Sequence, residues 1–265
     1  MKRITSGGNS ARSSAKAQRR GKKPLIFLAG ESLLLNEFGP LCTAAGYRVA
    51  TRLNPGEPVP GRALKGSARI PSGVYLAVEL TNTDVVLKRK NLEALDRSLP
   101  RPIPVLTSSL TVSTTEQASW VRHARRLVGI GALPTLLSGK LIELAPSVQT
   151  DTAVVGQARD FFSKLGKEIA VVQDRVGMVM PRILCMLINE ASFALMEEVA
   201  SPADLDTAMK LGTNYPRGPI EWADRIGIRQ VVSVLRALHA DLGEERYRIS
   251  PLLQLMARGE PWWRT

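Results

Sequence analysis

The sequence has 265 residues, of which 44% are hydrophobic and 23% charged, a balance typical of a folded protein of one or two domains. Its net charge is +12, and no apolar run reaches the roughly 18 residues that a membrane span requires. The chain has two cysteines, Cys42 and Cys185, and two histidines, so we expect buried thiols, no metal site and a reducing, cytoplasmic location.

Residues 1–23 carry eight basic residues and no acidic one, so they hold eight of the twelve excess charges and leave +4 for the rest. This segment is rich in serine, glycine and alanine, and we expect it to be disordered. Three interpretations are open: a passive solubilising tail or mis-assigned start, a weak anion-binding arm, and a transit peptide.

A βαβ unit begins the predicted fold. The apolar run 23–30 predicts a buried strand, 32–45 predicts a helix closed by Gly46, and 47–53 predicts a second strand. Two such strands with a helix between them lie parallel in one sheet. Residues 54–73 hold four prolines and four glycines, which predict an irregular connection.

The alternation continues beyond this connection. We expect further strands at 74–80, 103–107, 141–144 and 169–173. We expect helices at 84–99, from Ser113 to about 127 with Glu116 completing a capping box, and at 150–165. The pattern predicts an α/β fold with a Rossmann-like, doubly wound parallel sheet over residues 24–175.

Beyond Asp174 the pattern becomes entirely helical. We expect helices at 178–199, 202–211, 219–226, 228–242 and 251–257. The first carries a broad apolar face typical of the central helix of a bundle. The sequence therefore predicts an all-α C-terminal domain over residues 176–265.

The first βα turn is the place for a dinucleotide pyrophosphate. Of the G-x-G-x-x-G spacing only Gly30 is present, with Leu28 and Leu33 at the outer positions and Glu31 beside the phosphate site. The second strand lacks the acid that binds an adenosine ribose, although Arg52 suits a 2′-phosphate. Two interpretations of this turn remain open: it binds NAD or NADP, or the βαβ crossover is kept only for folding.

Several motifs of the second half carry a specific resemblance. They are Gly166-Lys167, the helix Pro181-Arg182-Ile183-Leu184 through Ile188-Asn189-Glu190-Ala191, the run 199–212, Thr213-Asn214-Tyr215-Pro216-Arg217-Gly218-Pro219, and Tyr247-Arg248 with Ser250-Pro251-Leu252-Leu253. Through most of residues 74–258 the chain resembles the 3-hydroxyacyl-CoA dehydrogenase family. The resemblance implies a Rossmann-like NAD-binding domain and a helical domain that dimerises and binds substrate.

Members of that family oxidise 3-hydroxyacyl-CoA with NAD, using a histidine base, a glutamate that orients it, and a serine and an asparagine at the reacting oxygen. By resemblance the glutamate falls on Glu143 and the serine on Ser108. The histidine position, twelve residues before the glutamate, is Gly131, and the asparagine position is Pro181. The resemblance also places Glu79, with Gly30 a candidate cofactor-binding residue, at a position that helps bridge the domains. It places Lys88, with Ser108 a candidate substrate-binding residue, near the CoA site.

The retained residues also have plainer interpretations. Ser108 is then a loop cap, Glu143 a relic or a local salt-bridge partner, and Lys88 part of a solvated helix face. His123 and His239 are interpreted as partly exposed helical residues rather than displaced bases. The chain lacks the long arm after the second strand, and the family's usual end is replaced by Trp262-Trp263-Arg264-Thr265; with Trp222, these tryptophans are interpreted as packing or dimer residues.

Three functions remain open. One is a catalytically impaired member that binds acyl-CoA or acts as a partner subunit, as a homodimer or as a heteromer with an active relative. Another is an active NAD(P)-dependent dehydrogenase in which Glu143 acts as base through a water. The last is tail-driven binding to RNA or a membrane surface, although nucleic acid is not an expected partner.

Overall fold

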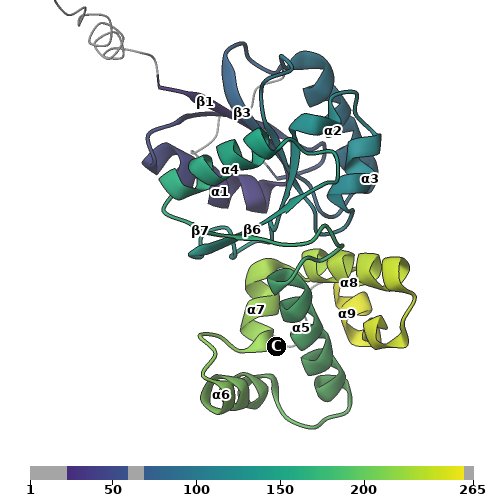
Figure 1. Cartoon of the computed structure of the whole chain (residues 1–265). Coiled ribbons are helices and arrows are strands. Elements are labelled where there is room, and N and C mark those ends of the chain that lie inside the picture. The colour runs from purple at the N-terminus through teal and green to yellow at the C-terminus, as the bar shows by residue number, and fades with distance from the viewer. Residues whose placement is uncertain (1–22, 59–68, 260–265) are drawn as a thin grey trace, which may run out of the picture.

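The computed structural model describes residues 23–58 and 69–259. A seven-stranded sheet flanked by helices comes first, and a group of helices packs beneath it (Figure 1). The strands are β1 (Leu25–Gly30), β2 (Arg48–Leu53), β3 (Val74–Leu80), β4 (Val105–Ser108), β5 (Leu127–Ile130), β6 (Leu141–Pro146) and β7 (Glu168–Val171). The chain is thus Rossmann-like with a helical C-terminal domain, and the predicted fold class is confirmed.

The strand order is β2-β1-β3-β4-β5-β6-β7. The first five strands run parallel, with Gly30 opposite both Leu53 and Leu80. The expectation of a wholly parallel sheet is wrong at one place, because β6 pairs antiparallel to β5, with Ile130 opposite Leu144. Strand β7 is parallel to β6. The β5–β6 connection lacks the crossover helix that a parallel pair needs.

Helices cover both faces of the sheet (Figure 1). One face holds α1 (Ser32–Ala44) and α4 (Thr152–Lys164), where Phe38, Phe161 and Phe162 pack together edge to face or tilted. The other face holds α2 (Val85–Ser98) and α3 (Thr114–Ser119). Because both faces are covered, β1 and β4 are buried at every position.

Strand β5 is not among the predicted elements, because the sequence pattern predicts that residues 116–127 continue a helix. Helix α3 ends at Ser119, and a 3₁₀ turn, Ala124–Arg126, leads into β5. His123 therefore does not lie on a helix, and its Nδ1 lies 2.9 Å from Oδ1 of Asp96. Arg126 also contacts the Asp96 carboxylate. His123 and Asp96 therefore belong to a structural cluster of three side chains.

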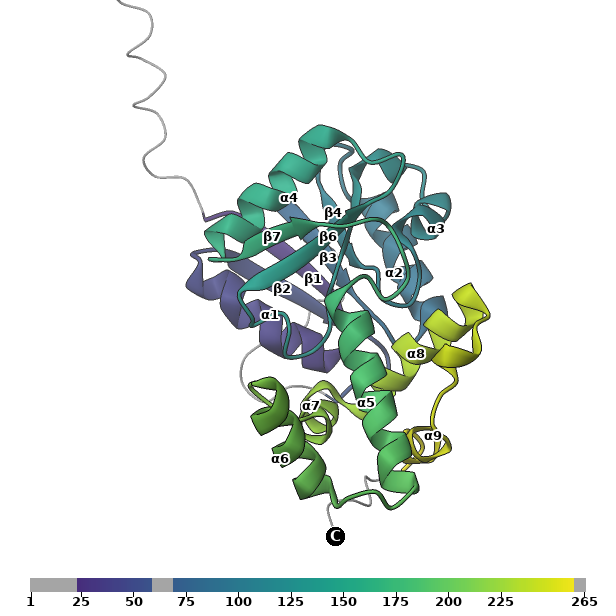
Figure 2. The ribbon, with the colours of Figure 1, turned by 60° about the horizontal axis from the view of Figure 1, so that its bottom comes forward.

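The helical domain surrounds one long helix (Figure 2). Its helices are α5 (Met180–Met196), α6 (Pro202–Thr213), α7 (Pro219–Ile226), α8 (Ile228–Leu242) and α9 (Pro251–Met256). Trp222 is buried in this core with the guanidinium of Arg217 over its ring, as expected of a packing residue. His239 is an exposed residue of α8. Within the described residues no helix is long and apolar enough to cross a bilayer.

The two cysteines are free and buried, as predicted. Cys42 belongs to α1 and Cys185 to α5. Burial raises the pKa of each thiol to about 12. The basic tail, Trp262 and Trp263 lie outside the described residues, so the expectations for them stay predictions.

Candidate functional site

The first βα turn is closed by Gly30, the last residue of β1. Its φ is +143°, and a Cβ at this position would lie 2.3 Å from the carbonyl oxygen of Leu80. Only glycine is compatible with this close approach. The outer positions of the fingerprint keep their leucines: Leu28 is buried within β1, while Leu33 is half exposed on α1.

The N-terminus of α1 is capped by a carboxylate from the connection after β2. Ser32 donates to Oε2 of Glu57 through its backbone N–H, over 2.8 Å, and through its hydroxyl, over 2.7 Å. In a dinucleotide-binding domain, backbone N–H groups at this end of the helix bind phosphate. Here the chain supplies the anion itself. The sequence placed Glu57 only in an irregular segment, and no local signal marks its role.

A second carboxylate, that of Glu31, occupies the loop after β3. Its Oε1 accepts the backbone N–H groups of Asn82 (2.8 Å) and Thr83 (2.7 Å), and the Thr83 hydroxyl. Its Oε2 accepts from the side-chain amide of Gln230 on α8. Glu31 is buried, and these four donors compensate the loss of its hydration.

These contacts decide whether the turn fits a dinucleotide. Glu57 takes the helix N–H and Glu31 adds a second carboxylate beside the same turn. Both would repel a pyrophosphate. Arg52, the candidate for a 2′-phosphate, donates to Asn91 and lies over the ring of Phe27. In this conformation the turn does not fit the pyrophosphate of NAD or NADP.

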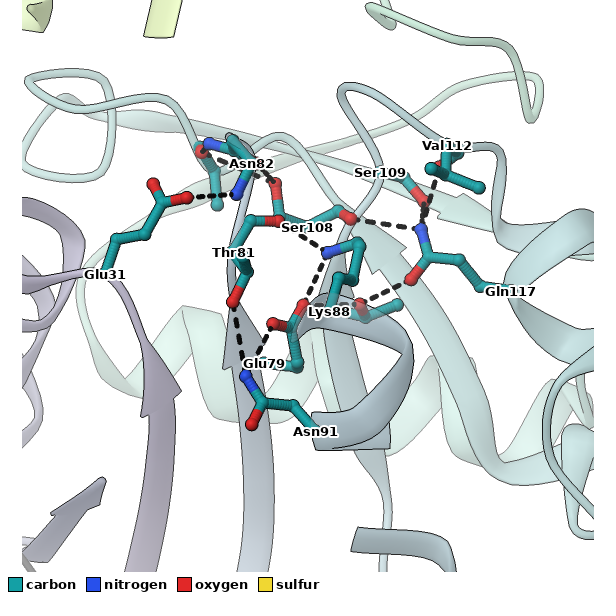
Figure 3. A network of polar contacts seen from close by, with 12 residues as sticks. Glu31, Glu79, Thr81, Asn82, Lys88, Asn91, Ser108, Ser109, Val112 and Gln117 are labelled. Atoms are coloured by element: carbon teal, nitrogen blue, oxygen red, sulfur yellow. Dashed lines mark hydrogen bonds and ion pairs between the residues drawn. The ribbon is translucent and has the colours of Figure 1, made fainter. Parts of the chain in front are cut away.

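Ser108 lies in a closed network at the carboxyl ends of β3 and β4 (Figure 3). Its hydroxyl contacts Oδ1 of Asn82 over 2.5 Å and the carbonyl oxygen of Ala132 over 3.5 Å. Asn82 in turn donates to the carbonyl of Ala132 and to the side chain of Gln230. Ser108 is fully buried. Its hydroxyl therefore holds Asn82, which in turn reaches the helical domain, and does not cap the loop that follows β4.

Lys88 and Glu79 form a fully buried ion pair. The ammonium of Lys88 also donates to the carbonyl of Thr81 over 2.8 Å, and the Thr107 hydroxyl lies 3.2 Å from Glu79. Lys88 is therefore not on a solvated helix face, and its charge does not face solvent where a CoA phosphate could meet it. All described partners of Glu79 belong to the α/β domain, so contacts between the domains are made by other residues, Gln230 among them.

The predicted glutamate and histidine positions do lie together. The N–H of Gly131 donates to the Glu143 carbonyl over 3.0 Å, and a Cβ on Gly131 would lie 3.4 Å from the Cβ of Glu143. The sulfur of Met178 would be 3.6 Å from that added Cβ. A methyl group at Gly131 would thus be in van der Waals contact with the Met178 thioether and the Glu143 side chain.

The Glu143 carboxylate is engaged at the start of α5. Its two oxygens accept the backbone N–H groups of Val179, over 2.9 Å, and Met180, over 2.7 Å. Pro181, the asparagine position, is buried in the first turn, where its missing N–H costs no hydrogen bond. Glu143 therefore caps a helix and fastens the sheet to the helical domain.

A cavity of about 950 Å³ opens beside the first βα turn. It is bounded by the start of α1, the α7–α8 junction and the residues after α9. Its charged lining residues are Glu31, Glu57, Asp224, Arg229 and Arg258. No group of acidic, histidine and cysteine side chains in the described ranges could hold a metal ion.

The fold and this junction define a class of protein: a Rossmann-like domain joined to a helical domain at the carboxyl end of its sheet. Residues 64–175 match the family domain described as "3-hydroxyacyl-CoA dehydrogenase, NAD binding domain", and residues 177–260 match "3-hydroxyacyl-CoA dehydrogenase, C-terminal domain". The chain belongs to the 3-hydroxyacyl-CoA dehydrogenase family.

The relatives carry related names. A 3-hydroxybutyryl-CoA dehydrogenase of Bradyrhizobium diazoefficiens is 34% identical over 178 residues, which is 67% of this chain and 61% of that protein. A 3-hydroxyadipyl-CoA dehydrogenase of Escherichia coli is 37% identical over 147 residues, 56% of this chain and 30% of that protein. The matched part thus spans less than two thirds of either relative.

One solved structure shows the shared fold. That of (S)-3-hydroxybutyryl-CoA dehydrogenase from Ralstonia eutropha has a TM-score of 0.73 and 23% identity. The similarity covers 90% of this chain and 96% of that one. It therefore extends over the sheet and the helical domain together.

Proposed function

We propose that this protein is a catalytically impaired member of its family that binds acyl-CoA without oxidising it. The observation that carries the proposal is the pair Gly131 and Met178. The position at which the family resemblance places the base has no side chain, and a thioether sulfur occupies the adjacent space. Positioned general bases contribute about 10²–10⁴-fold to proton-transfer reactions.

The remaining carboxylate is a poor substitute. Both oxygens of Glu143 hold backbone N–H groups of α5, so moving this side chain to a substrate would leave two donors uncapped. The poor fit of the first βα turn to a pyrophosphate supports the same proposal. The family's NAD-binding domain is kept as architecture, while its anion-binding positions are taken by Glu31 and Glu57.

The test mixes the purified protein with acetoacetyl-CoA and NADH or NADPH, and follows absorbance of the reduced nicotinamide. An active relative serves as positive control. We expect no turnover from the wild type, together with saturable binding of acetoacetyl-CoA in calorimetry. Turnover that disappears in Glu143→Gln would instead establish an active enzyme with a rearranged base.

We also propose that the helical domain forms a homodimer. Helix α6 has no buried residue, Leu211 is 83% exposed and Val199, just before this helix, is 68% exposed. Apolar side chains left exposed in this way favour a protein–protein interface on this face. We expect Leu211→Asp to shift the mass measured by light scattering from dimer to monomer. Val148→Asp, on an 89% exposed valine of the α/β domain, is the matched control and leaves the dimer intact. A wild-type monomer that dimerises only with an active relative would favour the heteromer.

A further inference from the structure

Three arginines of the helical domain line one small cavity. Arg229 and Arg236 lie on α8, and Arg258 follows α9. The cavity, about 200 Å³, is completed by Thr83, from the loop after β3, and by the following residues: Val232, Ser233, Gln254 and Ala257. We call it the arginine pocket. It lies at the junction of the two domains, and no carboxylate of the described residues lines it.

The spacing of the α8 residues explains why Arg229, Ser233 and Arg236 share one face. Residues 229, 233 and 236 are four and three positions apart on α8, so they lie on one stripe of the helix. All three arginines are exposed, and the apolar side of α8 is buried in the domain core. Their position is therefore not required by packing of the core.

Their charges are also uncompensated within the described part of the chain. No ion pair joins Arg229, Arg236 or Arg258 to an acidic residue there, whereas Arg217 and Arg225 of the same domain share Glu221. Like charges gathered around one cavity repel each other, and this cost is offset when an anion binds.

Most of the donors that remain available belong to the guanidinium groups, and the Gln254 amide already donates to the carbonyl of Ile249. The Ser233 hydroxyl already donates to the carbonyl of Arg229, and the Thr83 hydroxyl already donates to Glu31. Guanidinium groups present several N–H donors in a planar fork that matches the oxygens of a phosphate. The chemistry of the pocket thus favours a compact, multiply charged oxyanion.

We propose that the arginine pocket binds a phosphate monoester of an organic ligand whose remaining part lies in the neighbouring 950 Å³ cavity. The two cavities share Thr83, Arg229, Ala257 and Arg258, so one ligand can enter both. Glu31 and Glu57 line the larger cavity and repel phosphate, so the charged phosphate groups of the ligand stay near Arg229 and Arg258, and its uncharged part extends past the two carboxylates. Resting on the proposed function, the source of this phosphate is the 3′-phosphate of coenzyme A.

The test measures calorimetric binding of coenzyme A, 3′-dephospho-coenzyme A and inorganic pyrophosphate to the full chain. The variant is Arg229→Gln with Arg236→Gln. The control, Arg159→Gln with Lys164→Gln, removes the same charge from the exposed surface of α4. We expect wild type and control to bind coenzyme A about tenfold or more tightly than the dephospho form. In the arginine variant this preference is lost.

The outcomes separate the two proposals. If wild type and arginine variant bind coenzyme A and its 3′-dephospho form equally well, acyl-CoA binding is supported and the arginine pocket is overturned. Pyrophosphate binding that is lost only in the arginine variant, without coenzyme A binding, supports the pocket and overturns coenzyme A as its ligand. Equal weakening in the arginine variant and the charge control would show a nonspecific effect of net charge and overturn the pocket.

Discussion

Glu31 and Gln230 are 199 positions apart in the sequence, and their side chains are hydrogen-bonded across the domain junction. Glu31 stands between β1 and α1, while Gln230 lies in the first turn of α8. Gln230 also accepts from Asn82 over 2.9 Å. A single amide therefore links the start of α1, the end of β3 and the helical domain.

Replacing Glu31 with glutamine should destabilise the protein strongly. The variant places an amide among donors that require an acceptor, and at least one buried N–H loses its partner. We expect a loss of about 3 kcal/mol in the free energy of unfolding, measured by urea denaturation. Glu190→Gln, on the exposed side of α5, is the control and should change stability by less than about 0.5 kcal/mol. Equal effects of the two substitutions would contradict the assigned role.

Two glycines should respond oppositely to alanine. A Cβ on Gly30 would collide with the Leu80 backbone at a φ of +143°, so Gly30→Ala should cost about 3 kcal/mol or more. A Cβ on Gly131 would meet no atom closer than 3.4 Å, so Gly131→Ala should cost less than about 1 kcal/mol. Melting temperatures of the two variants, compared side by side, test this. A collapse of Gly131→Ala would show that the space beside Met178 is already full.

Asp96 should contribute stability that depends on pH. Burial acts to raise its pKa, but hydrogen bonds from the Arg122 backbone, Arg126 and His123 outweigh it and hold the pKa below its ordinary value. The contribution is therefore complete above the unfolded pKa of about 3.9, and is lost as pH falls through the lower folded pKa. Asp96→Asn should cost about 3 kcal/mol at pH 7 and progressively less below pH 4. A cost that does not change with pH would refute this.

Both thiols should be unreactive in the native protein. Burial raises the pKa of Cys42 and of Cys185 to about 12, so the thiolate fraction at pH 8 is on the order of 10⁻⁴. A disulfide reagent that reports thiolate release should give almost no signal until denaturant is added, and then two thiols per chain. Rapid native reaction of either cysteine would indicate local opening of α1 or α5.

Much of the fold follows from local pattern. The apolar run before Gly30 and the helical spacing after it predict β1 and α1, because neighbouring residues alone determine that periodicity. Strand β5 was missed because its four residues directly follow a 3₁₀ turn with helix-forming residues. The antiparallel pairing of β6 depends on long-range registry, which periodicity does not contain.

The positions of the candidate site residues could be predicted from the sequence, but their burial and their contacts could not. The resemblance placed Glu143 beside Gly131, and the structure brings them together. Lys88 stands between two basic residues and looked solvated, yet a partner nine positions earlier holds it fully buried. The role of Glu57 depends on where an irregular connection returns in space, and no residue pattern near it specifies that path.

The carboxylate cap on α1 has a consequence for how the protein tolerates its surroundings. When a bound ligand satisfies the end of a helix, folding stability rises and falls with the concentration of that ligand. Here Glu57 reaches Ser32 within the same chain. The hydrogen bonds at the start of α1 are therefore complete without a bound phosphate, and the fold of the first βα turn does not depend on one.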